Sequence, residues 1–162
     1  MTIRLARPDD WAGIWPIWRA VVRAGETYVW PPETDEADAR TFWMLPAPAE
    51  VWVVDDEAHG IVATATLKPN QQGLGDHVAN ASFMVDPSVA GRGVGRGLAE
   101  AVLDRARELG YKAMQFNAVV ATNERAVALW RSLGFDVVGT IPGGFRHATL
   151  GPVDLLIMHR QL

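Results

Sequence analysis

Three glycines at alternate positions, Gly91, Gly93 and Gly95, stand beside two arginines, Arg92 and Arg96. Because glycine has no Cβ atom, the backbone N–H groups of such a run can turn toward one side. An apolar run precedes the glycines and a helix-forming run follows them. The free N–H groups and the positive dipole end of a helix would then lie together, which favours binding of a phosphate anion.

The two best-known phosphate motifs do not match this segment. The pattern Gly-x-x-x-x-Gly-Lys-Ser/Thr does not occur, and Gly-x-Gly-x-x-Gly fails whether it begins at Gly91, Gly93 or Gly95. A P-loop site and a Rossmann site are therefore disfavoured. A glycine-rich turn without a ligand is the other alternative, but Arg92 and Arg96 gain electrostatic energy beside the loop only if an anion binds.

Length and composition indicate an ordinary globular chain. It has 162 residues, of which 49% are hydrophobic, and a formal net charge of −4, so one domain over residues 1–162 is predicted. The mild acidic excess gives no reason to expect nucleic-acid binding. Cysteine is absent, which excludes disulfides, thiolate metal ligands and a cysteine nucleophile, and no metal site is predicted.

The first residues lack the apolar run of a signal peptide, and no stretch has the length of a membrane span. A cytoplasmic location without a membrane partner is the default expectation. Five of the seven tryptophans precede residue 45. We expect that part of the chain to build an aromatic-walled surface as well as core.

Hydrophobic periodicity predicts an α/β order of elements. Pro16 should delay the regular part of the first helix to about Ile14, because proline removes a helix hydrogen bond. The other helices are predicted over 35–45, 94–109 and 124–133, and the strands over 3–5, 51–54, 61–67, 78–85, 114–120, 137–141 and 153–160. The loop over 142–152 is long for a hairpin, which suggests a functional or subunit contact.

Two predicted central strands carry polar side chains. A strand, crossover helix and strand in one sheet form a parallel unit, so 78–85 and 114–120 should be parallel neighbours. Asn80 and Ser82 share one face of the first strand, and Asn117 lies on the second. A covered sheet should be nearly all apolar, so these side chains indicate a buried network or a cleft. We favour a cleft, because both strands flank the phosphate loop.

The glycine segment resembles the pyrophosphate loop of the GCN5-related N-acetyltransferases. That loop is written Gln/Arg-x-x-Gly-x-Gly/Ala and here reads Ala90-Gly91-Arg92-Gly93-Val94-Gly95, with Ala90 departing at the first position. A second segment, residues 123–135, reads Asn-x-x-Ala-x-x-Leu-Trp-x-x-x-Gly-Phe and resembles the second signature of the same family. The two signatures stand in the family's order and, with the segments between them, span about the last half of the chain.

The resemblance implies a single-domain acyl-CoA N-acyltransferase fold, an α/β fold with a mixed sheet of about seven strands and about four helices, and acetyl-CoA as the coenzyme. In this family the backbone mostly binds the coenzyme A pyrophosphate. The residues expected to contact coenzyme A come from the strand, the loop and the later helix: Phe83, Met84, Val85, Ala90, Gly91, Arg92, Gly93, Val94, Gly95, Arg96, Asn123, Ala126 and Trp130.

Direct acetyl transfer needs a neutral amine, a donor to the developing oxyanion and a proton for the leaving thiolate. The resemblance implies a backbone N–H near Met84 or Val85 as the oxyanion donor. Many relatives protonate the thiolate with a tyrosine where this chain has Trp130. A thiol pKa of about 8.5 makes the leaving group only modestly basic, so Asn123, with Asn117 behind it, is the proposed contact.

Glu26 and His77 are the candidates for the base that deprotonates the amine. The alternatives are a helix-capping role for Glu26 and a loop position without a chemical role for His77. A narrower resemblance concerns the acceptor: segments 68–70, 77–78, 93–96, 109–111, 116–117 and 122–123 are similar to N-acetyltransferases of proline analogues such as azetidine-2-carboxylate. The Glu26-Thr27 pair is similar to phosphinothricin-type acetyltransferases. Both imply an amino acid or its analogue as acceptor. The residues predicted to bind it are Glu26, Thr27, Tyr28, Asn80, Asn117 and Arg146, and a surface or dimer role is an equal alternative for Arg146.

Two other functions stay open. A protein or peptide amine acetyltransferase would need an open acceptor groove, against which the early tryptophans argue. A non-catalytic acyl-CoA sensor would fit the absent tyrosine and the departure at Ala90. A homodimer is also expected, because the predicted 142–152 loop is long.

Overall fold

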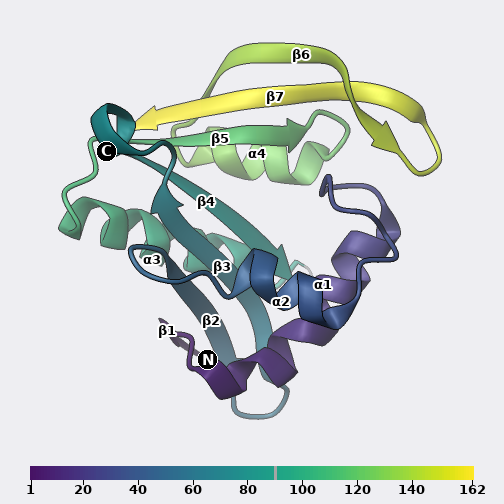
Figure 1. Ribbon diagram of the computed structural model, residues 1–162, viewed down its shortest axis with the longest axis vertical. Helices are drawn as coiled ribbons and strands as arrows, with labels where there is room; N and C mark the ends of the chain where they lie inside the picture. The colour runs from purple at the N-terminus through teal and green to yellow at the C-terminus, as the bar shows by residue number, and fades with distance from the viewer. Residues whose placement is uncertain (90) are drawn as a thin grey trace.

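The computed structural model describes residues 1–89 and 91–162, which form one mixed sheet with helices on both faces (Figure 1). The strands are β1 (Thr2–Leu5), β2 (Glu50–Asp56), β3 (Gly60–Pro69), β4 (Val78–Val85), β5 (Ala113–Val120), β6 (Asp136–His147) and β7 (Gly151–Gln161). The helices are α1 (Trp11–Ala24), α2 (Glu36–Trp43), α3 (Val94–Glu108) and α4 (Glu124–Ser132), with short 3₁₀ turns at Pro8–Asp10, Gly73–Gly75 and Pro87–Val89. The predicted α/β fold with about seven strands and four helices is confirmed.

The sheet has the order β1-β2-β3-β4-β5-β7-β6, and β4 and β5 are its parallel neighbours, as predicted. They pair only at Val78 with Ala113 and at Ala79 with Met114. Beyond these residues the two strands diverge, which opens the sheet at its centre (Figure 1). The antiparallel pairs on either side hold the two halves in place.

Separate hydrophobic cores cover the two faces of the sheet. On one face α1 and α2 bury an aromatic cluster that includes Trp11, Trp18 and Trp43, together with Met84 of β4. On the other face α3 and α4 pack against the sheet, and Phe83 and Val85 lie on that core. Successive side chains of a strand point to opposite faces, so β4 contributes to both cores.

Helix α1 begins earlier than predicted. Its first residue is Trp11, and Pro16 lies inside the helix, so the expectation of a start near Ile14 was wrong. Proline removes the hydrogen bond to the carbonyl four residues earlier, here Ala12. Ala12 and Pro16 are both exposed. Water can therefore satisfy the freed carbonyl, and the helix runs through the proline on its solvent side.

The predicted loop over 142–152 is mostly strand, which corrects that prediction. β6 continues to His147, β7 begins at Gly151, and only residues 148–150 form the turn. A register shift between Ile141 and Phe145 absorbs the Pro-Gly-Gly segment. β6 is an edge strand, where a proline without an N–H is tolerated and a bulge is easily formed. The long loop that motivated the dimer is thus absent from the described hairpin.

An ion-pair cluster joins β1 to the start of α1. Arg4 donates to Asp10 at 2.7 and 2.9 Å and to Asp55 at 2.7 Å, and the Arg7 N–H donates to Asp10 at 2.6 Å. The Arg4 guanidinium lowers the pKa of Asp10 from 3.8 to about 2. A carboxylate with a lowered pKa stabilises the folded state above its unfolded pKa, and this contribution is lost as pH falls through the folded pKa.

Replacing Asp10 with asparagine should therefore lower the free energy of unfolding by about 2 kcal/mol at pH 7. The difference from wild type should shrink as pH falls from about 4 toward 2, which urea unfolding at a series of pH values measures. Asp9→Asn is the matched control, because Asp9 is exposed. A loss at Asp10 that stayed constant across this pH range would contradict the prediction.

Candidate active site

A chain of side-chain amides lies where β4 and β5 separate. Asn80 Nδ2 donates to the backbone carbonyl of Gln115 at 2.9 Å and so bridges the strands just past their last backbone pairs. Gln115 Nε2 then donates to Asn117 Oδ1 at 2.8 Å, and Asn117 Nδ2 donates to Asn70 Oδ1 at 2.7 Å. Each amide nitrogen carries a second N–H. The amide chain therefore closes the apex of the opening and still has donors to offer.

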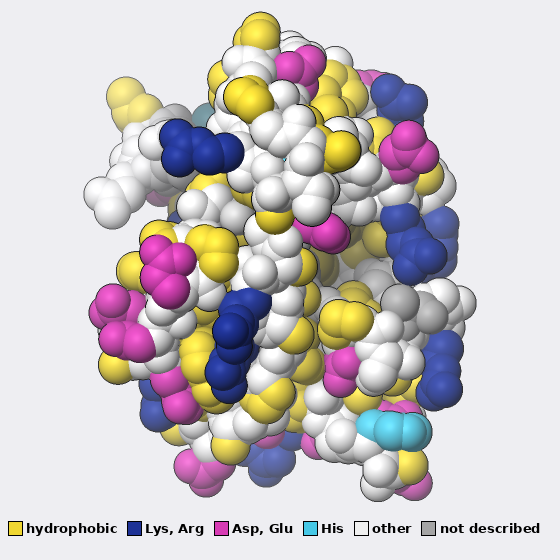
Figure 2. Space-filling view, turned by 90° about the vertical axis from the view of Figure 1, so that its right-hand side faces the viewer, with side chains coloured by type: hydrophobic (Ala, Val, Ile, Leu, Met, Phe, Trp, Pro, Cys, Tyr) yellow, Lys and Arg dark blue, Asp and Glu magenta, His cyan; other side chains and the backbone are white. Residues whose placement is uncertain are grey.

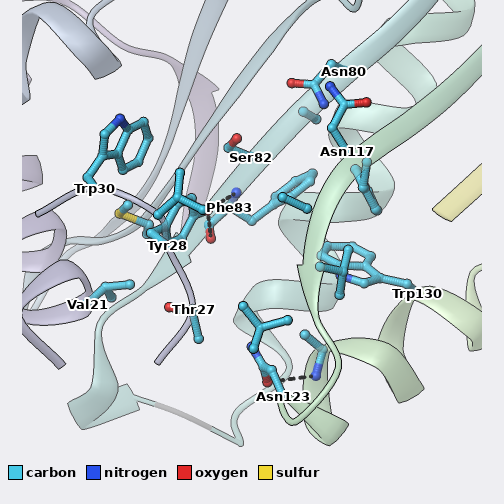
Figure 3. Close-up of a pocket in the computed structure, with 18 of the residues that line it drawn as sticks. Val21, Thr27, Tyr28, Trp30, Asn80, Ser82, Phe83, Asn117, Asn123 and Trp130 are labelled. Carbon is cyan, nitrogen blue, oxygen red and sulfur yellow. Dashed lines mark hydrogen bonds between the residues drawn. The ribbon is translucent and has the colours of Figure 1, made fainter. Parts of the chain in front are cut away.

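A cavity of about 410 Å³ fills the opening between β4 and β5. Asn80, Ser82 and Met84 line it from the face of α1, whereas Phe83 and Val85 line it from the face of α3 and α4. The cavity therefore passes through the sheet. Figure 3 shows its walls, with Val21, Thr27, Tyr28 and Trp30 on one side and Asn117, Asn123 and Trp130 on the other. Among the described residues that line it, none carries a formal charge at neutral pH.

Tyr28 reaches from the α1–α2 loop into the plane of the sheet. Its hydroxyl donates to the Phe83 carbonyl at 2.8 Å and accepts from the Phe83 N–H at 3.0 Å (Figure 3). Burial raises the pKa of Tyr28 well above its usual value, so the phenol stays neutral. The ring stacks on Trp30 at 5.2 Å between centroids. One aromatic side chain thus occupies both hydrogen-bonding groups of Phe83 on the open edge of β4.

The glycine loop forms an anion cradle beside the cavity. Gly91 and Gly93 have φ values of +88° and +79°, which other L residues rarely adopt. Gly95 is helical, and a Cβ there would lie 3.4 Å from a Val85 methyl, at the limit of ordinary van der Waals contact. No side chain caps α3, and its first intrahelical bond runs from the Gly97 N–H to the Gly93 carbonyl at 3.0 Å.

The N–H groups of residues 94–96 therefore precede that bond and point out of the helix, which suits a diphosphate. Arg92 is exposed. Arg96 donates to the Ser132 hydroxyl at 2.7 Å and lies 3.6 Å from Glu100, so it also joins α3 to α4. Ala90, predicted to contact the coenzyme, lies outside the described residues. The described part of the loop fits the pyrophosphate of coenzyme A.

A model of the acetyltransferase (GNAT) family matches residues 14–135, which include the anion cradle, both central strands and α4. The chain belongs to the GNAT family. Its fold agrees closely with a GCN5-related N-acetyltransferase from Kribbella flavida, with a TM-score of 0.94, 47% identity and coverage of 99% of this chain and 97% of that one. The yncA acetyltransferase from Salmonella typhimurium, solved with its cofactor acetyl-CoA, has a TM-score of 0.81 and 27% identity over 100% of this chain and 94% of that chain.

Two curated relatives have names that describe their activities. The N-acetyltransferase aca1 of Schizosaccharomyces pombe is 38% identical over 96 residues, which are 59% of this chain and 46% of that protein. The L-amino acid N-acyltransferase MnaT of Escherichia coli is 29% identical over 145 residues, 88% of this chain and 83% of that protein. The match to aca1 thus spans less than half of that relative. The prediction of a GNAT acetyltransferase that uses acetyl-CoA is confirmed at the level of the family.

Two GNAT residues predicted on α4 have clear structural roles. Asn123 caps the helix, because its Oδ1 accepts from the Ala126 N–H at 3.2 Å. Asn123 also lines the cavity, and its NH₂ group carries two N–H donors. Trp130 is nearly buried and packs on Phe83 and Phe116 at centroid distances of 5.1 and 4.7 Å. It therefore builds the wall at the position where many relatives carry a tyrosine.

The cavity is lined by ten of the twenty predicted GNAT site residues. Those that line it are Thr27, Tyr28, Asn80, Phe83, Met84, Val85, Asn117, Asn123, Ala126 and Trp130. Glu26, His77 and Arg146 are exposed and are not among its lining residues. In Figure 3 Asn117 lies beside Asn80 at one end of the cavity, and Asn123 lies at the other end.

Sequence reasoning did not assign Val21 or Trp30 to the site, although both line the cavity. Ser82 also lines it, on the strand face for which a cleft was predicted. The signal for Trp30 was the excess of tryptophans before residue 45. The surface is hollowed near its centre on the face that Figure 2 shows.

Among residues 1–89 and 91–162, no group of three or more His, Asp or Glu side chains could hold a metal ion. No helix in the same residues combines the length and apolarity that a membrane crossing requires.

Proposed function

We propose that this GNAT protein transfers the acetyl group of acetyl-CoA directly to the amine of an amino acid or amino-acid analogue within a ternary complex. The observation that carries the proposal is the cavity of about 410 Å³ that passes through the sheet. Its size suits a small molecule, and its two faces allow donor and acceptor to enter from opposite sides. The activity for which MnaT is named, that of an L-amino acid N-acyltransferase, supports the same acceptor class.

The donor side consists of the anion cradle and the open edge of β4. The Asp86 N–H donates to Val62 of β3 at 2.9 Å. Because backbone N–H groups alternate in direction along a strand, the Val85 N–H points away from β3 and toward the opening. The Met84 N–H points to β3. Of the two predicted oxyanion donors, the geometry therefore favours Val85.

The acceptor side consists of the amide chain and the aromatic wall. The second N–H groups of Asn80 and Asn117 and the Ser82 hydroxyl are neutral donors that suit a substrate carboxylate. Tyr28 and Trp30 supply an apolar surface for the rest of the acceptor. A site of this small volume suits a free amino acid better than a peptide segment.

Proton transfer uses weak groups in this proposal. The NH₂ group of Asn123 donates a hydrogen bond to the departing thiolate, which is only modestly basic and takes its proton from water. Glu26, next to Thr27, and His77, at the start of β4, are the two proposed bases. Each acts through water, because neither lines the cavity.

The proposal is tested by thiol release from acetyl-CoA with a panel of free amino acids, including cyclic imino acids and phosphinothricin, and lysine peptides beside them. We expect turnover with a free amino acid. Asn117→Ala should lower kcat/KM for it by roughly tenfold to a hundredfold, as expected when a hydrogen bond to a charged group is lost. Its effect should fall mainly on the KM of the amino acid.

Asn70→Ala is the matched control. It removes the Asn117 partner in the amide chain, yet Asn70 does not line this cavity. A smaller loss at Asn70 than at Asn117 would support direct contact with the acceptor. Turnover with lysine peptides alone would overturn the proposed acceptor, and coenzyme binding without turnover on any amine would indicate a sensor.

A further inference from the structure

We propose that Tyr28 is the end wall of the acyl site and restricts the transferred group to acetyl. The inference rests on the proposed function, in which acetyl-CoA is the donor in this cavity. The sequence predicted Tyr28 only as a residue that contacts the acceptor. The structure instead places its hydroxyl in the plane of the sheet, where the two faces of the cavity meet.

The hydroxyl of Tyr28 is fixed by two hydrogen bonds to one residue. It donates to the Phe83 carbonyl and accepts from the Phe83 N–H, at 2.8 and 3.0 Å. A phenol has one proton and two lone pairs, so only one lone pair remains free. Both Phe83 groups on the open edge of β4 are thereby satisfied without a ligand.

The ring of Tyr28 is fixed as well. It lies parallel to Trp30, with 4° between the planes, and edge-on to Trp43 at 6.2 Å. Trp30 stacks in turn on Phe42, and Trp43 donates through Nε1 to the Thr64 hydroxyl at 2.9 Å. Retreat of the phenol would disrupt this aromatic packing, so the wall cannot easily move back for a longer acyl chain.

The direction of the open edge places Tyr28 at its inner end. The anion cradle follows the C-terminal end of β4. Counted from the cradle, Val85 is therefore the first residue whose backbone N–H and C=O groups face the opening, and Phe83 is the next. Neighbouring positions on one edge are about 7 Å apart. A pantetheine arm that runs from the cradle along β4 therefore passes Val85 and ends at the Tyr28 phenol. A short acyl group fits before that wall, and a butyryl group would press on it.

The experiment compares acetyl-CoA, propionyl-CoA and butyryl-CoA with wild type, Tyr28→Phe and Tyr28→Ala. Calorimetric affinities are measured for each thioester and for free coenzyme A, and kcat/KM is measured with the best amino acid. Wild type should bind and use butyryl-CoA roughly tenfold to a hundredfold less well than acetyl-CoA. Tyr28→Ala should reduce that preference by roughly tenfold or more.

Tyr28→Phe is the matched control, because it keeps the ring and removes only the hydroxyl. Tyr28→Phe should keep the preference for acetyl-CoA within about threefold of the wild-type preference. The affinity of every variant for free coenzyme A should also stay within about threefold of the wild-type affinity. If Tyr28→Ala does not fold, as judged by circular dichroism and thermal unfolding, Tyr28→Leu replaces it with the same expectation.

An unchanged preference in a folded Tyr28→Ala or Tyr28→Leu protein would overturn the inference. Equal affinity of wild type for acetyl-CoA and butyryl-CoA would also overturn it. The proposed function fails in a different way, through absence of turnover with amino acids. Calorimetry still reads the acyl-chain preference in that case, so the two failures are distinguishable.

Discussion

Replacing Gly93 with aspartate should reduce the affinity for acetyl-CoA by about a hundredfold or more. The carboxylate would stand at the anion cradle, where the pyrophosphate is expected. Two unit charges about 5 Å apart repel by about 3 kcal/mol at an effective dielectric constant of about 20, and about 1.4 kcal/mol corresponds to a tenfold change in affinity. Isothermal titration calorimetry at fixed ionic strength measures the loss.

Gly93→Asn is the matched control for this substitution. Gly93 has a φ of +79°, and among the described residues other than its two chain neighbours no atom lies within 4 Å of the position a Cβ would take. Asparagine and aspartate both adopt this left-handed conformation more readily than other residues. The affinity of the asparagine variant for acetyl-CoA should fall about fivefold, as expected for about 1 kcal/mol of backbone strain. Equal losses in the two variants would show that strain, and not charge, governs the site.

Replacing Trp43 with alanine should lower the free energy of unfolding by about 3 to 5 kcal/mol. Trp43 is completely buried under α2, and its indole donates to the Thr64 hydroxyl at 2.9 Å. Removing the indole leaves a cavity beside Tyr28 and Trp30, whose ring centroids each lie 6.2 Å from that of Trp43. The loss is a large part of the stability of a typical domain. Urea unfolding followed by far-UV circular dichroism measures it.

Phe42→Ala provides the comparison on the same helix. Phe42 is 39% exposed, so Phe42→Ala should lower the free energy of unfolding by only about 1 kcal/mol. Because both residues support Trp30, each variant should also weaken binding of the amino-acid acceptor. A Trp43 loss no larger than the Phe42 loss would contradict the assignment of Trp43 to the core of the α1–α2 face.

Local rules explain which parts of the fold the sequence could predict. The parallel pairing of β4 and β5 follows from a strand, helix and strand order with a glycine-ended helix. The same local rules gave two errors, at the start of α1 and in the 142–152 segment. Proline and glycine are read as breakers from sequence. Pro16 lies on the solvent face of a helix and Pro142 on an edge strand, where tertiary position makes them tolerable.

The sequence by itself determined the anion cradle, because a glycine's backbone freedom and a helix N-terminus are properties of neighbouring residues. Only the tertiary structure decided which side chains reach the cavity. Tyr28 and Phe83 are 55 residues apart in the chain, and the hydrogen bond between the Asn117 and Asn70 side-chain amides joins residues 47 positions apart. Pairs this distant leave no periodic trace in a sequence. The packing of α1 and α2 on the divided sheet brings Tyr28 to β4, while Glu26, two residues away, stays exposed.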